Sequence, residues 1–315
     1  MTAPHPDAPV IGLDLGGTKI AAALVGSDGT VLARHTLPTP ATEGAEVVLD
    51  ALAIAARAVR VHGTTAIGVA AAGVIDPVTA TVTSATDTIR GWAGTALAAG
   101  LATRTGLPVA CDNDVRAAAA TELDGPDDDR TLLYAAVGTG VGGAVAAAGR
   151  MLHGAAGIAG HLGHPPSPEA DGLPCTCGAT GHLEAVAAGP AITAHCARLG
   201  GRPADRLQTV AARAAQGDPH ATAAITLGAR ATGRVLGGLA NALGPHRVVV
   251  AGGVPRIGAL YWDALCAAFA AELMPPLRAL RPRPPQGGAD AAVLGAAALP
   301  RTLPLHRPPT TGAPS

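Results

Sequence analysis

Three glycine-rich turns, each placed directly after a run of apolar residues, constrain the fold of this chain more than any other feature. The turns occupy residues 14–19, 138–143 and 252–253. An apolar run stopped by glycines is typical of a buried strand, because glycine allows a tight turn and a close approach of the backbone to a bound group. Strand-like and helix-like segments alternate between the turns, which predicts an α/β protein of two lobes.

The alternation also predicts how the chain is divided. We expect strands at residues 10–13, 20–25, 30–35, 66–71, 109–111, 132–137 and 247–251, and helices at 47–61, 95–105, 115–123, 188–199, 207–216, 221–243, 260–273 and 289–298. Residues 10–115 are expected to form an N-terminal lobe, completed by a helix near 289–300, and residues 116–288 a larger C-terminal lobe. The Pro-rich ends, 1–9 and 303–315, carry no apolar period and are expected to be flexible tails.

The composition argues against several classes of protein. A formal net charge of −1 and an aromatic content of 2% argue against nucleic-acid binding by phosphate neutralisation or base stacking. Residues 131–149 are uncharged, but their many glycines and alanines disfavour a membrane span. Residues 1–9 lack the features of a signal peptide, and 5 cysteines, an odd number, favour a reducing compartment. We therefore expect a cytoplasmic protein without nucleic-acid or membrane partners.

The first turn, residues 14–19, reads Asp-Leu-Gly-Gly-Thr-Lys. Gly16 and Gly17 let backbone N–H groups point at a phosphate, Thr18 adds a hydroxyl and Lys19 a charge. Asp14 is placed to hold Mg²⁺ or its water. Lys19 is the sole lysine among 22 basic residues, and its compact ammonium suits a phosphate loop. The alternative is a hairpin turn with incidental charge.

The second turn, residues 138–143, formally matches the dinucleotide fingerprint GxGxxG. A dinucleotide-binding unit needs an acidic residue about 20 positions further on, where this chain has His161 and His164. A glycine hairpin over phosphates fits better. The candidate phosphate contacts are Gly138, Thr139, Gly140 and Gly142, with Gly252 and Gly253 as the third glycine turn.

Residues 112–114 read Asp-Asn-Asp at an expected strand-to-helix junction. A carboxylate there can accept a hydroxyl proton in phosphoryl transfer, which makes Asp114 the candidate general base. Asn and Asp are also favoured helix N-caps, so a purely structural role stays open.

Residues 164–182 contain two histidines and two cysteines at the spacing H-x10-C-x-C-x4-H: His164, Cys175, Cys177 and His182. Thiolates and imidazoles are zinc ligands, and four of them make a closed tetrahedral structural site. The alternative is two surface thiols with unrelated histidines. Cys111, Cys196 and Cys266 lie in apolar segments and are expected to be buried core thiols.

As a set, these motifs resemble the ROK family, which comprises bacterial glucokinases, other sugar kinases and sugar-responsive repressors. The resemblance covers about residues 10–300, where DLGGTK, AAAGVID, WAG, NDxxxAA, GTGVGG, the cysteine loop and VVVAGGV occur in family order. It implies a two-lobed actin-like ATPase (ribonuclease H-like) fold with nucleotide and sugar in the cleft between the lobes. It further implies ATP with Mg²⁺, and a structural Zn²⁺.

The resemblance also implies roles for individual residues. Residues 14–19 and 138–143 match the two phosphate loops, and Gly252 and Gly253 lie near the adenosine. Asp114 matches the base that takes the proton from the sugar hydroxyl. The positions that match sugar-binding residues are Gly73, Asn113, Asp114, His161, His164 and Glu184, of which His164 also matches a zinc ligand.

Three positions depart from the family pattern. His161 stands where the family has a sugar-binding Glu, and loss of such a charge-assisted hydrogen bond costs about 1.5–3 kcal/mol. His182 replaces the third cysteine, which gives a Cys2His2 donor set that zinc accepts. Arg116 stands where Asn is common, near the same pocket.

These observations predict an ATP-dependent kinase for a primary hydroxyl of a hexose or hexose-like substrate in carbohydrate metabolism. Glucose, an aminosugar and a C7-cyclitol are all candidates because of the departures around the sugar, and polyphosphate stays open as a donor. The alternative is a catalytically inactive sugar-binding regulator. A repressor is disfavoured, since the first motif starts at Asp14 and leaves no room for a helix-turn-helix module before it. Family members are commonly oligomers, and we expect a homodimer.

Overall fold

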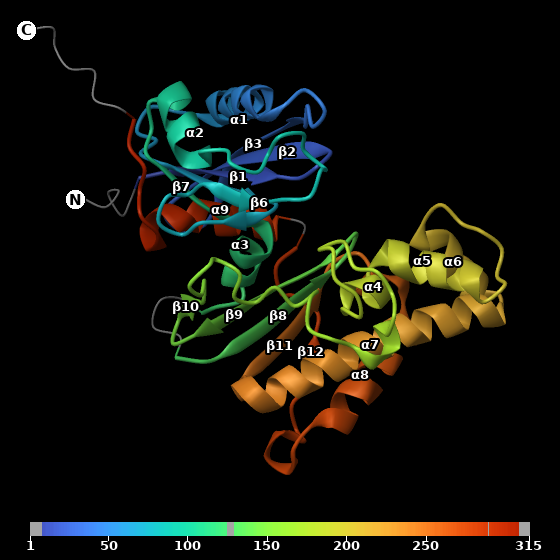
Figure 1. Ribbon diagram of the computed structural model, residues 1–315. Coiled ribbons are helices and arrows are strands. Elements are labelled where there is room, and N and C mark those ends of the chain that lie inside the picture. Colours follow the sequence, from blue (N-terminus) through green and yellow to red (C-terminus); the bar gives the residue numbers. More distant parts are fainter. Residues whose placement is uncertain (1–7, 125–128, 289, 309–315) are drawn as a thin grey trace, which may run out of the picture. The chain divides into compact units, whose positions relative to one another are not determined.

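A computed structural model describes residues 8–124, 129–288 and 290–308, which fold into two compact units (Figure 1). Unit 1 contains Met1–Glu122, His153–Ile158 and Gly287–Ser315, and unit 2 contains Leu123–Leu152 and Ala159–Gln286. The expected boundary after residue 115 falls inside helix α3 (Asp114–Ala120). Unit 1 extends beyond it because α3 packs on the helix supplied by the C-terminal segment.

Unit 1 is built on a five-stranded mixed sheet in the order β3-β2-β1-β4-β7. Its strands are β1 (Val10–Leu15), β2 (Lys19–Val25), β3 (Val31–Pro38), β4 (Ile67–Ala71) and β7 (Val109–Asn113), and a two-stranded ribbon pairs β5 (Val74–Ile75) with β6 (Val82–Ser84). β1, β2 and β3 are antiparallel neighbours, whereas β1, β4 and β7 run parallel. Helices α1 (Ala45–Val59) and α2 (Leu97–Thr105) cover one face, and α3 and α9 (Ala291–Thr302) lie on the other (Figure 1).

Two glycines in the sheet of unit 1 explain how closely α9 approaches it. A Cβ atom on Gly68 of β4 would lie 1.7 Å from the carbonyl oxygen of Ala296, and one on Gly12 of β1 would lie 2.1 Å from that of Val293. Any side chain at these positions would therefore push the helix away from the sheet. These two glycines of β1 and β4 therefore leave the space that α9, from the C-terminal part of the chain, occupies.

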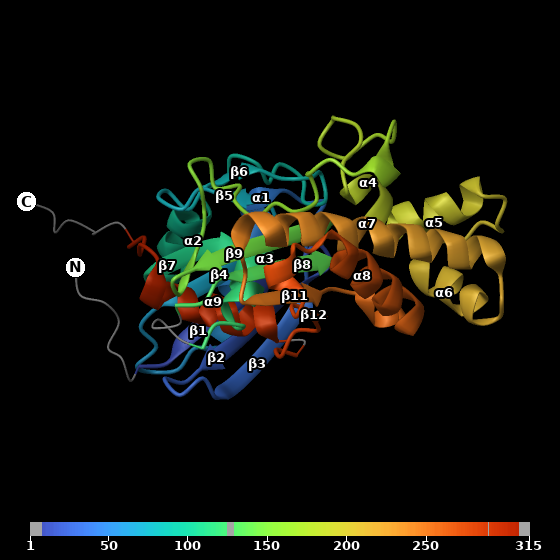
Figure 2. The ribbon, with the colours of Figure 1, turned by 90° about the horizontal axis from the view of Figure 1, so that it is seen from below.

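Unit 2 repeats the plan with a sheet in the order β10-β9-β8-β11-β12. Its strands are β8 (Leu132–Val137), β9 (Val141–Ala147), β10 (Arg150–Met151), β11 (Arg247–Ala251) and β12 (Pro282–Arg283). Its helices are α4 (Glu184–Ala187), α5 (Gly189–Arg198), α6 (Leu207–Ala215), α7 (Pro219–Leu243) and α8 (Ala259–Glu272), with short 3-10 turns at Pro168–Ala170, Pro255–Ile257 and Pro275–Leu277. α7, the longest helix in Figure 2, packs along α8.

The expected alternation of strands and helices is confirmed, with instructive differences. β5, β6, β10, β12 and α4 are absent from the expected elements, because segments of two to four residues are too short to show a period. β9 is also absent from them, because its sequence, VGGAVAA, does not alternate apolar and polar residues. Part of the expected C-terminal tail is ordered against unit 1, since His306 exchanges two backbone hydrogen bonds with Val109, at 2.8 and 2.9 Å. The remaining expected tail residues, 1–7 and 309–315, lie outside the described residues.

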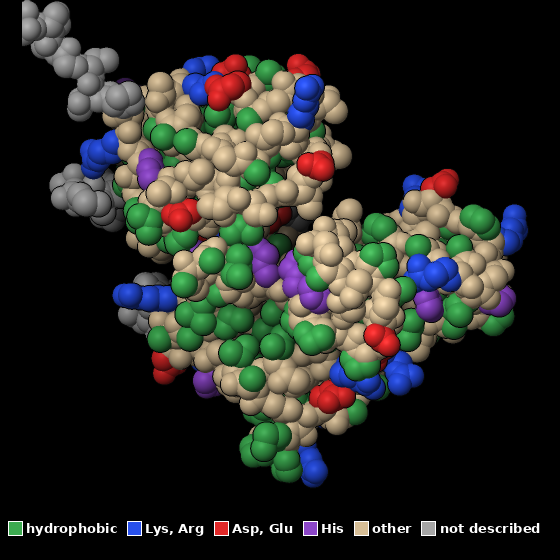
Figure 3. Space-filling view, viewed as in Figure 1, with side chains coloured by type: hydrophobic (Ala, Val, Ile, Leu, Met, Phe, Trp, Pro, Cys, Tyr) green, Lys and Arg blue, Asp and Glu red, His purple; other side chains and the backbone are tan. Residues whose placement is uncertain are grey.

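The uncharged run at residues 131–149 forms the β8–β9 hairpin, and no helix among the described residues is long and apolar enough to cross a membrane. Charged side chains lie in small groups of mixed sign on the face shown in Figure 3.

Candidate functional site

The three parallel strands of unit 1 bring its predicted site residues to one edge of the sheet. Leu15 of β1 pairs with Ala71 of β4, which pairs in turn with Asn113 of β7, so all three strands end at the same level. The segments that follow are the turn at residues 16–19, the loop containing Gly73 and the start of α3. Unit 1 thus gathers the predicted phosphate loop, one predicted sugar loop and the predicted base.

The turn at residues 16–19 is a tight connection between β1 and β2. The Gly16 N–H donates to the Lys19 carbonyl at 3.0 Å, and the Thr39 hydroxyl donates to the Gly16 carbonyl at 2.7 Å. A Cβ on Gly17 would lie 2.4 Å from a methyl carbon of exposed Thr88, so a side chain at this position would have to displace that of Thr88. Lys19 is exposed. The turn therefore presents bare backbone next to a cation, which is the arrangement that a phosphate loop needs.

Two carboxyl groups share this edge. Burial and, to a smaller extent, the nearby charge of Asp114 raise the pKa of Asp14 to about 6, while Lys19 acts to lower it. Burial also raises the pKa of Asp114, although its carboxylate accepts the Val115 N–H at 2.9 Å. Two neighbouring carboxylates with raised pKa values form a site that gains stability from a proton or a cation.

Asn113 is the N-cap of α3. Its side-chain oxygen accepts the N–H groups of Val115 and Arg116, at 3.0 and 3.3 Å, and its amide donates to the Gly73 carbonyl at 3.0 Å. Gly73 has φ +104°, and a Cβ there would lie 2.7 Å from the Ser84 carbonyl. The structural alternative considered for residues 112–114 therefore applies to Asn113. Asp114, one residue later, does not cap the helix.

The structure places Arg116 inside unit 1, where its side chain is 1% exposed. Its Nε donates to Asp112 at 2.7 Å, and Nη1 donates to the Gly157 carbonyl at 3.0 Å. The second oxygen of Asp112 lies 2.9 Å from His153 Nε2. Sequence reasoning missed this cluster, since no local pattern relates His153 to a strand end 41 residues earlier.

In unit 2 the two predicted glycine turns meet. β8 and β11 run parallel, with Ala136 paired to Ala251, so residues 138–143 and 252–253 follow at the same edge. The Val254 N–H donates to the Val137 carbonyl at 3.0 Å, and a Cβ on Gly252, at φ +100°, would lie 2.2 Å from that carbonyl oxygen. The start of α5 is hydrogen-bonded to the first of these turns, because the Gly189 N–H donates to the Gly138 carbonyl at 2.8 Å.

Glu184, a predicted sugar ligand, connects two parts of unit 2. One carboxylate oxygen accepts the Val141 N–H at 2.8 Å, and the other accepts the hydroxyl of Thr176. Val141 belongs to the glycine turn, and Thr176 stands between the two cysteines of the zinc motif. Glu184 therefore links the glycine turn to the cysteine loop, a role for which the sequence held no signal, and Thr176 is a contact that sequence reasoning missed.

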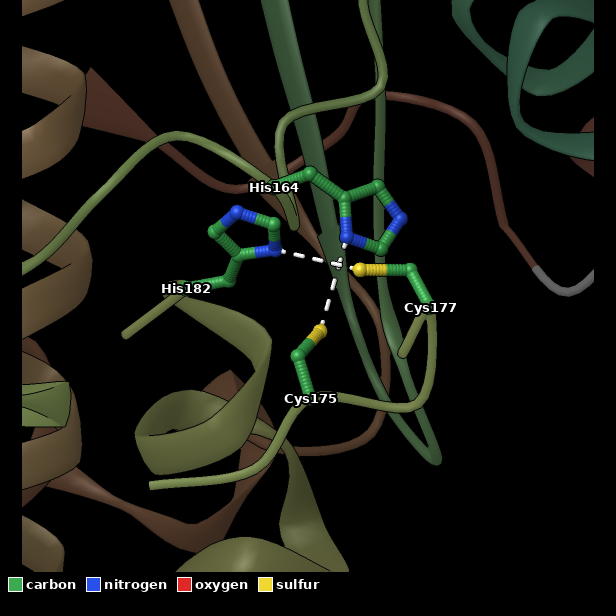
Figure 4. Close-up of side chains that lie close together, drawn as sticks. All are labelled: His164, Cys175, Cys177 and His182. Carbon is green, nitrogen blue, oxygen red and sulfur yellow. Dashed lines mark hydrogen bonds between the residues drawn. The ribbon is translucent and has the colours of Figure 1, made fainter. Parts of the chain in front are cut away.

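The four predicted zinc ligands converge, as Figure 4 shows. The donor atoms of His164, Cys175, Cys177 and His182 all lie within 4.8 Å of one another. Cys175 Sγ is 3.6 Å from His164 Nδ1, and Cys177 Sγ is 3.2 Å from His182 Nδ1. Zinc bonds of about 2.0–2.3 Å in a tetrahedron bring ligand atoms to such separations, so two thiolates and two imidazoles fit the ion. His161, half-buried, lies three residues before His164.

Comparison with known proteins gives matches over most of the chain. The family model described as "ROK family" matches residues 10–302. An N-acetylmannosamine kinase from Escherichia coli (strain 55989 / EAEC) is 36% identical over 246 residues, which cover 78% of this chain and 82% of the relative.

Two solved structures are also similar. A ROK hexokinase from Thermus thermophilus aligns with a TM-score of 0.79 and 36% identity, over 92% of this chain and 96% of that one. A ROK family glucokinase from Streptomyces griseus, in complex with glucose and AMPPNP, aligns with a TM-score of 0.76 and 31% identity, over 93% of this chain and 99% of that one.

Proposed function

This chain belongs to the ROK family, has the actin-like ATPase fold and is a phosphotransferase that acts on an alcohol group; from this premise we propose that it is an ATP-dependent kinase for a primary hydroxyl of a hexose or hexose-like substrate. The observation that carries the proposal is the shared edge of β1, β4 and β7. This edge gathers a bare glycine turn, a cation and two carboxylates, which are the groups that phosphoryl transfer requires.

Asp114 acts as the general base in this proposal. It takes the proton from the attacking hydroxyl, and its raised pKa makes the carboxylate a better proton acceptor at neutral pH than an ordinary Asp. Asn113 and Gly73, fixed to each other by a hydrogen bond, face the sugar beside it. The two residues at the end of β7 thus have separate roles, since Asn113 orients the substrate and Asp114 moves a proton.

Asp14 holds Mg²⁺, directly or through a water molecule. Carboxylate oxygens are the ligands that this hard cation prefers, and a cation near Asp14 offsets the burial and the smaller effect of Asp114 that together raise the pKa of Asp14. When bound, Mg²⁺ supplies positive charge that neutralises the phosphate oxygens. In unit 1 the turn at residues 16–19 contacts phosphate in this proposal. In unit 2 the turns at residues 138–142 and 252–253 are candidate nucleotide contacts.

The substrate class follows from the relatives and from one departure. The relatives named above comprise an N-acetylmannosamine kinase, a hexokinase and a glucokinase. His161 stands where the family pattern has a carboxylate, and an imidazole donates as well as accepts hydrogen bonds. We therefore include N-acetylated and amino hexoses, and cyclitols, beside glucose.

A structural zinc ion completes unit 2 in this proposal, held by His164, Cys175, Cys177 and His182. Metal analysis of protein purified without added metal is expected to give about one zinc per chain, since all four ligands are protein groups. Cys177→Ser is expected to lower this content, and Cys266→Ser, a substitution outside the cluster, is expected to leave it unchanged. Zinc far below one per chain in the unsubstituted protein would remove this part of the proposal.

The kinase proposal is tested by ADP release over a panel of glucose, mannose, N-acetylhexosamines, aminosugars and cyclitols. Asp114→Asn is expected to lower kcat on the best substrate by about 10²–10⁴-fold, because the base is lost while the shape is kept. Asp28→Asn, on an exposed turn of the same unit, is the control and is expected to retain full activity. Sugar binding by calorimetry without ADP release from the unsubstituted protein would favour the inactive regulator instead.

A further inference from the structure

The cluster of Asp112, Arg116 and His153 is a buried charged group that the proposed chemistry does not use. The side chains of Arg116 and Asp112 are 1% and 4% exposed, and that of His153 is 18% exposed. Burying an ion pair costs free energy that pairing often fails to recover, so such a pair is poorly explained by stability alone. Its contacts show what it holds in place.

On one side the cluster brackets Asn113. The Asp112 oxygen that accepts Arg116 Nε also accepts the backbone N–H of Asn113 at 2.7 Å. The backbone N–H of Arg116 donates to the side chain of Asn113 at 3.3 Å. The peptide group and the side chain of Asn113 are therefore both fixed by members of the cluster, and Asp114 follows directly.

On the other side the cluster fixes the segment His153–Ile158. His153 pairs with Asp112, and the carbonyl of Gly157 accepts from Arg116 Nη1, so contacts near both ends of the segment lead to the same ion pair. Gly157, at φ +70°, packs so tightly on β5 that a Cβ would lie 2.8 Å from the Ile75 carbonyl. His161 follows Gly157 by four residues along the chain.

We propose that Arg116 is a positioning residue of the kinase, which acts through Asp112 on Asn113 and Asp114 and anchors the segment His153–Ile158 to the end of β7 and to α3; this rests on the function proposed above. Arginine suits this position because its planar fork donates to Asp112 and to the Gly157 carbonyl at once. Lysine, with one ammonium on a flexible stem, does not reproduce that geometry. Arg116, which departs from the family pattern, therefore positions Asn113 and Asp114 and does not contact the sugar.

The test compares Arg116→Met and Arg116→Lys with Arg104→Met. Arg104 lies in the same unit and pairs with Glu46 and Asp50, both of them exposed residues. We expect Arg116→Met to lower kcat at least about tenfold, because small displacements of reacting groups cost this much or more, with the KM for ATP within twofold. Arg116→Lys is expected to restore part of kcat, and Arg104→Met to change neither constant.

Amide hydrogen exchange supplies a readout that does not depend on activity. Exchange within residues 153–158 is expected to be faster in Arg116→Met than in the unsubstituted protein and in Arg104→Met. An unsubstituted protein that turns over no substrate would overturn the proposed function and with it the positioning role, while faster exchange would still support the anchor.

Where the unsubstituted protein is active, three outcomes would overturn the positioning role. One is a rise in sugar KM alone, with kcat and exchange unchanged, which would make Arg116 a sugar contact. Another is a lower melting temperature with unchanged kcat of the folded protein, which would make the cluster merely structural. The third is faster exchange without a change in kcat. Should Arg116→Met fail to fold, His153→Ala, at the less buried end of the cluster, carries the same expectations with smaller changes.

Discussion

Asp14 illustrates how one environment serves both folding and chemistry. Its carboxyl group is largely buried and is also affected by the charge of Asp114, so the ionised form is disfavoured and the pKa rises to about 6. Ionisation of such a carboxyl group lowers the stability of the folded protein, and a bound cation restores it. The unfavourable charge is thus placed where the proposed reaction brings Mg²⁺ and phosphate.

The raised pKa of Asp14 predicts a pH-dependent effect of Asp14→Asn on stability. The folded pKa lies above the ordinary value of 3.8, so the stability that Asp14 contributes is complete below pH 3.8 and is lost as pH rises through about 6. Asn, which is always neutral, should therefore stabilise the protein at pH 8 by about 1–3 kcal/mol and at pH 5 by only about half as much. Urea unfolding at the two pH values measures the difference.

Asp28→Asn provides the opposite sign within the same unit. The hydroxyl and N–H of Thr30 lower the pKa of exposed Asp28, so its contribution is present at neutral pH and lost as pH falls through the folded pKa. Asn at position 28 should destabilise the protein at pH 8. For Asp14→Asn, in contrast, an equal change in the free energy of unfolding at pH 5 and pH 8 would contradict the prediction made above.

Thr176 offers a second test at the residue scale, because its hydroxyl holds the carboxylate that in turn holds the glycine turn of unit 2. Thr176→Val should raise the KM for ATP two- to tenfold, the range that corresponds to one net hydrogen bond. Zinc content should not change, since no metal ligand is altered. Steady-state kinetics and metal analysis check both, with exposed Thr180→Val as the control. An ATP KM equal to that of the control would show that Glu184 does not support the turn.

At the scale of elements, the contact between α7 and α8 depends on glycines at some positions and not at others. A Cβ on Gly233 would lie 2.2 Å from the Leu265 carbonyl, whereas one on Gly238 meets nothing within 4 Å. Gly233→Ala should therefore cost about 1–3 kcal/mol through overpacking, and Gly238→Ala should stabilise α7 by about 0.5–1 kcal/mol. Chemical unfolding measures both, and a shift of the same sign for the two variants would contradict the packing argument.

The elements that the sequence predicts well are those in which a periodic apolar pattern or an apolar run is long and clearly ended. The expected helix at residues 221–243 corresponds to α7 at Pro219–Leu243, and the strands before the glycine turns are predictable because apolar runs that end in glycine are distinctive. The cysteine loop is found because its ligands are close in sequence. The contacts of His153 and Thr176 escape prediction, since they depend on segments brought together by the sheets, and the inward position of Arg116 has no local signal.

At the scale of the whole molecule, unit 1 is assembled from segments far apart in the chain. α9 packs on β1, β4 and α3, and the Gly287 N–H donates to Glu122 at 3.4 Å. Figure 1 shows this C-terminal helix, in red, against strands drawn in blue and cyan. The glycines of β1 and β4 are shaped to receive the backbone of α9, so the first strands of the chain cannot complete their core until its last helix has formed.

This dependence predicts the effect of truncation. A chain that ends at Pro285 lacks α9 and leaves buried Ala70 and Ala117 without Ala296, so unit 1 should fail to fold, while a chain that ends at Pro308 keeps every described element. The shorter chain should lose helical and strand signal in circular dichroism and expose unit 1 to protease. Its urea m-value should fall, because m scales with the surface exposed on unfolding and one unit is already open. Equal m-values and midpoints for the two chains would show that the sheet of unit 1 folds without its helix.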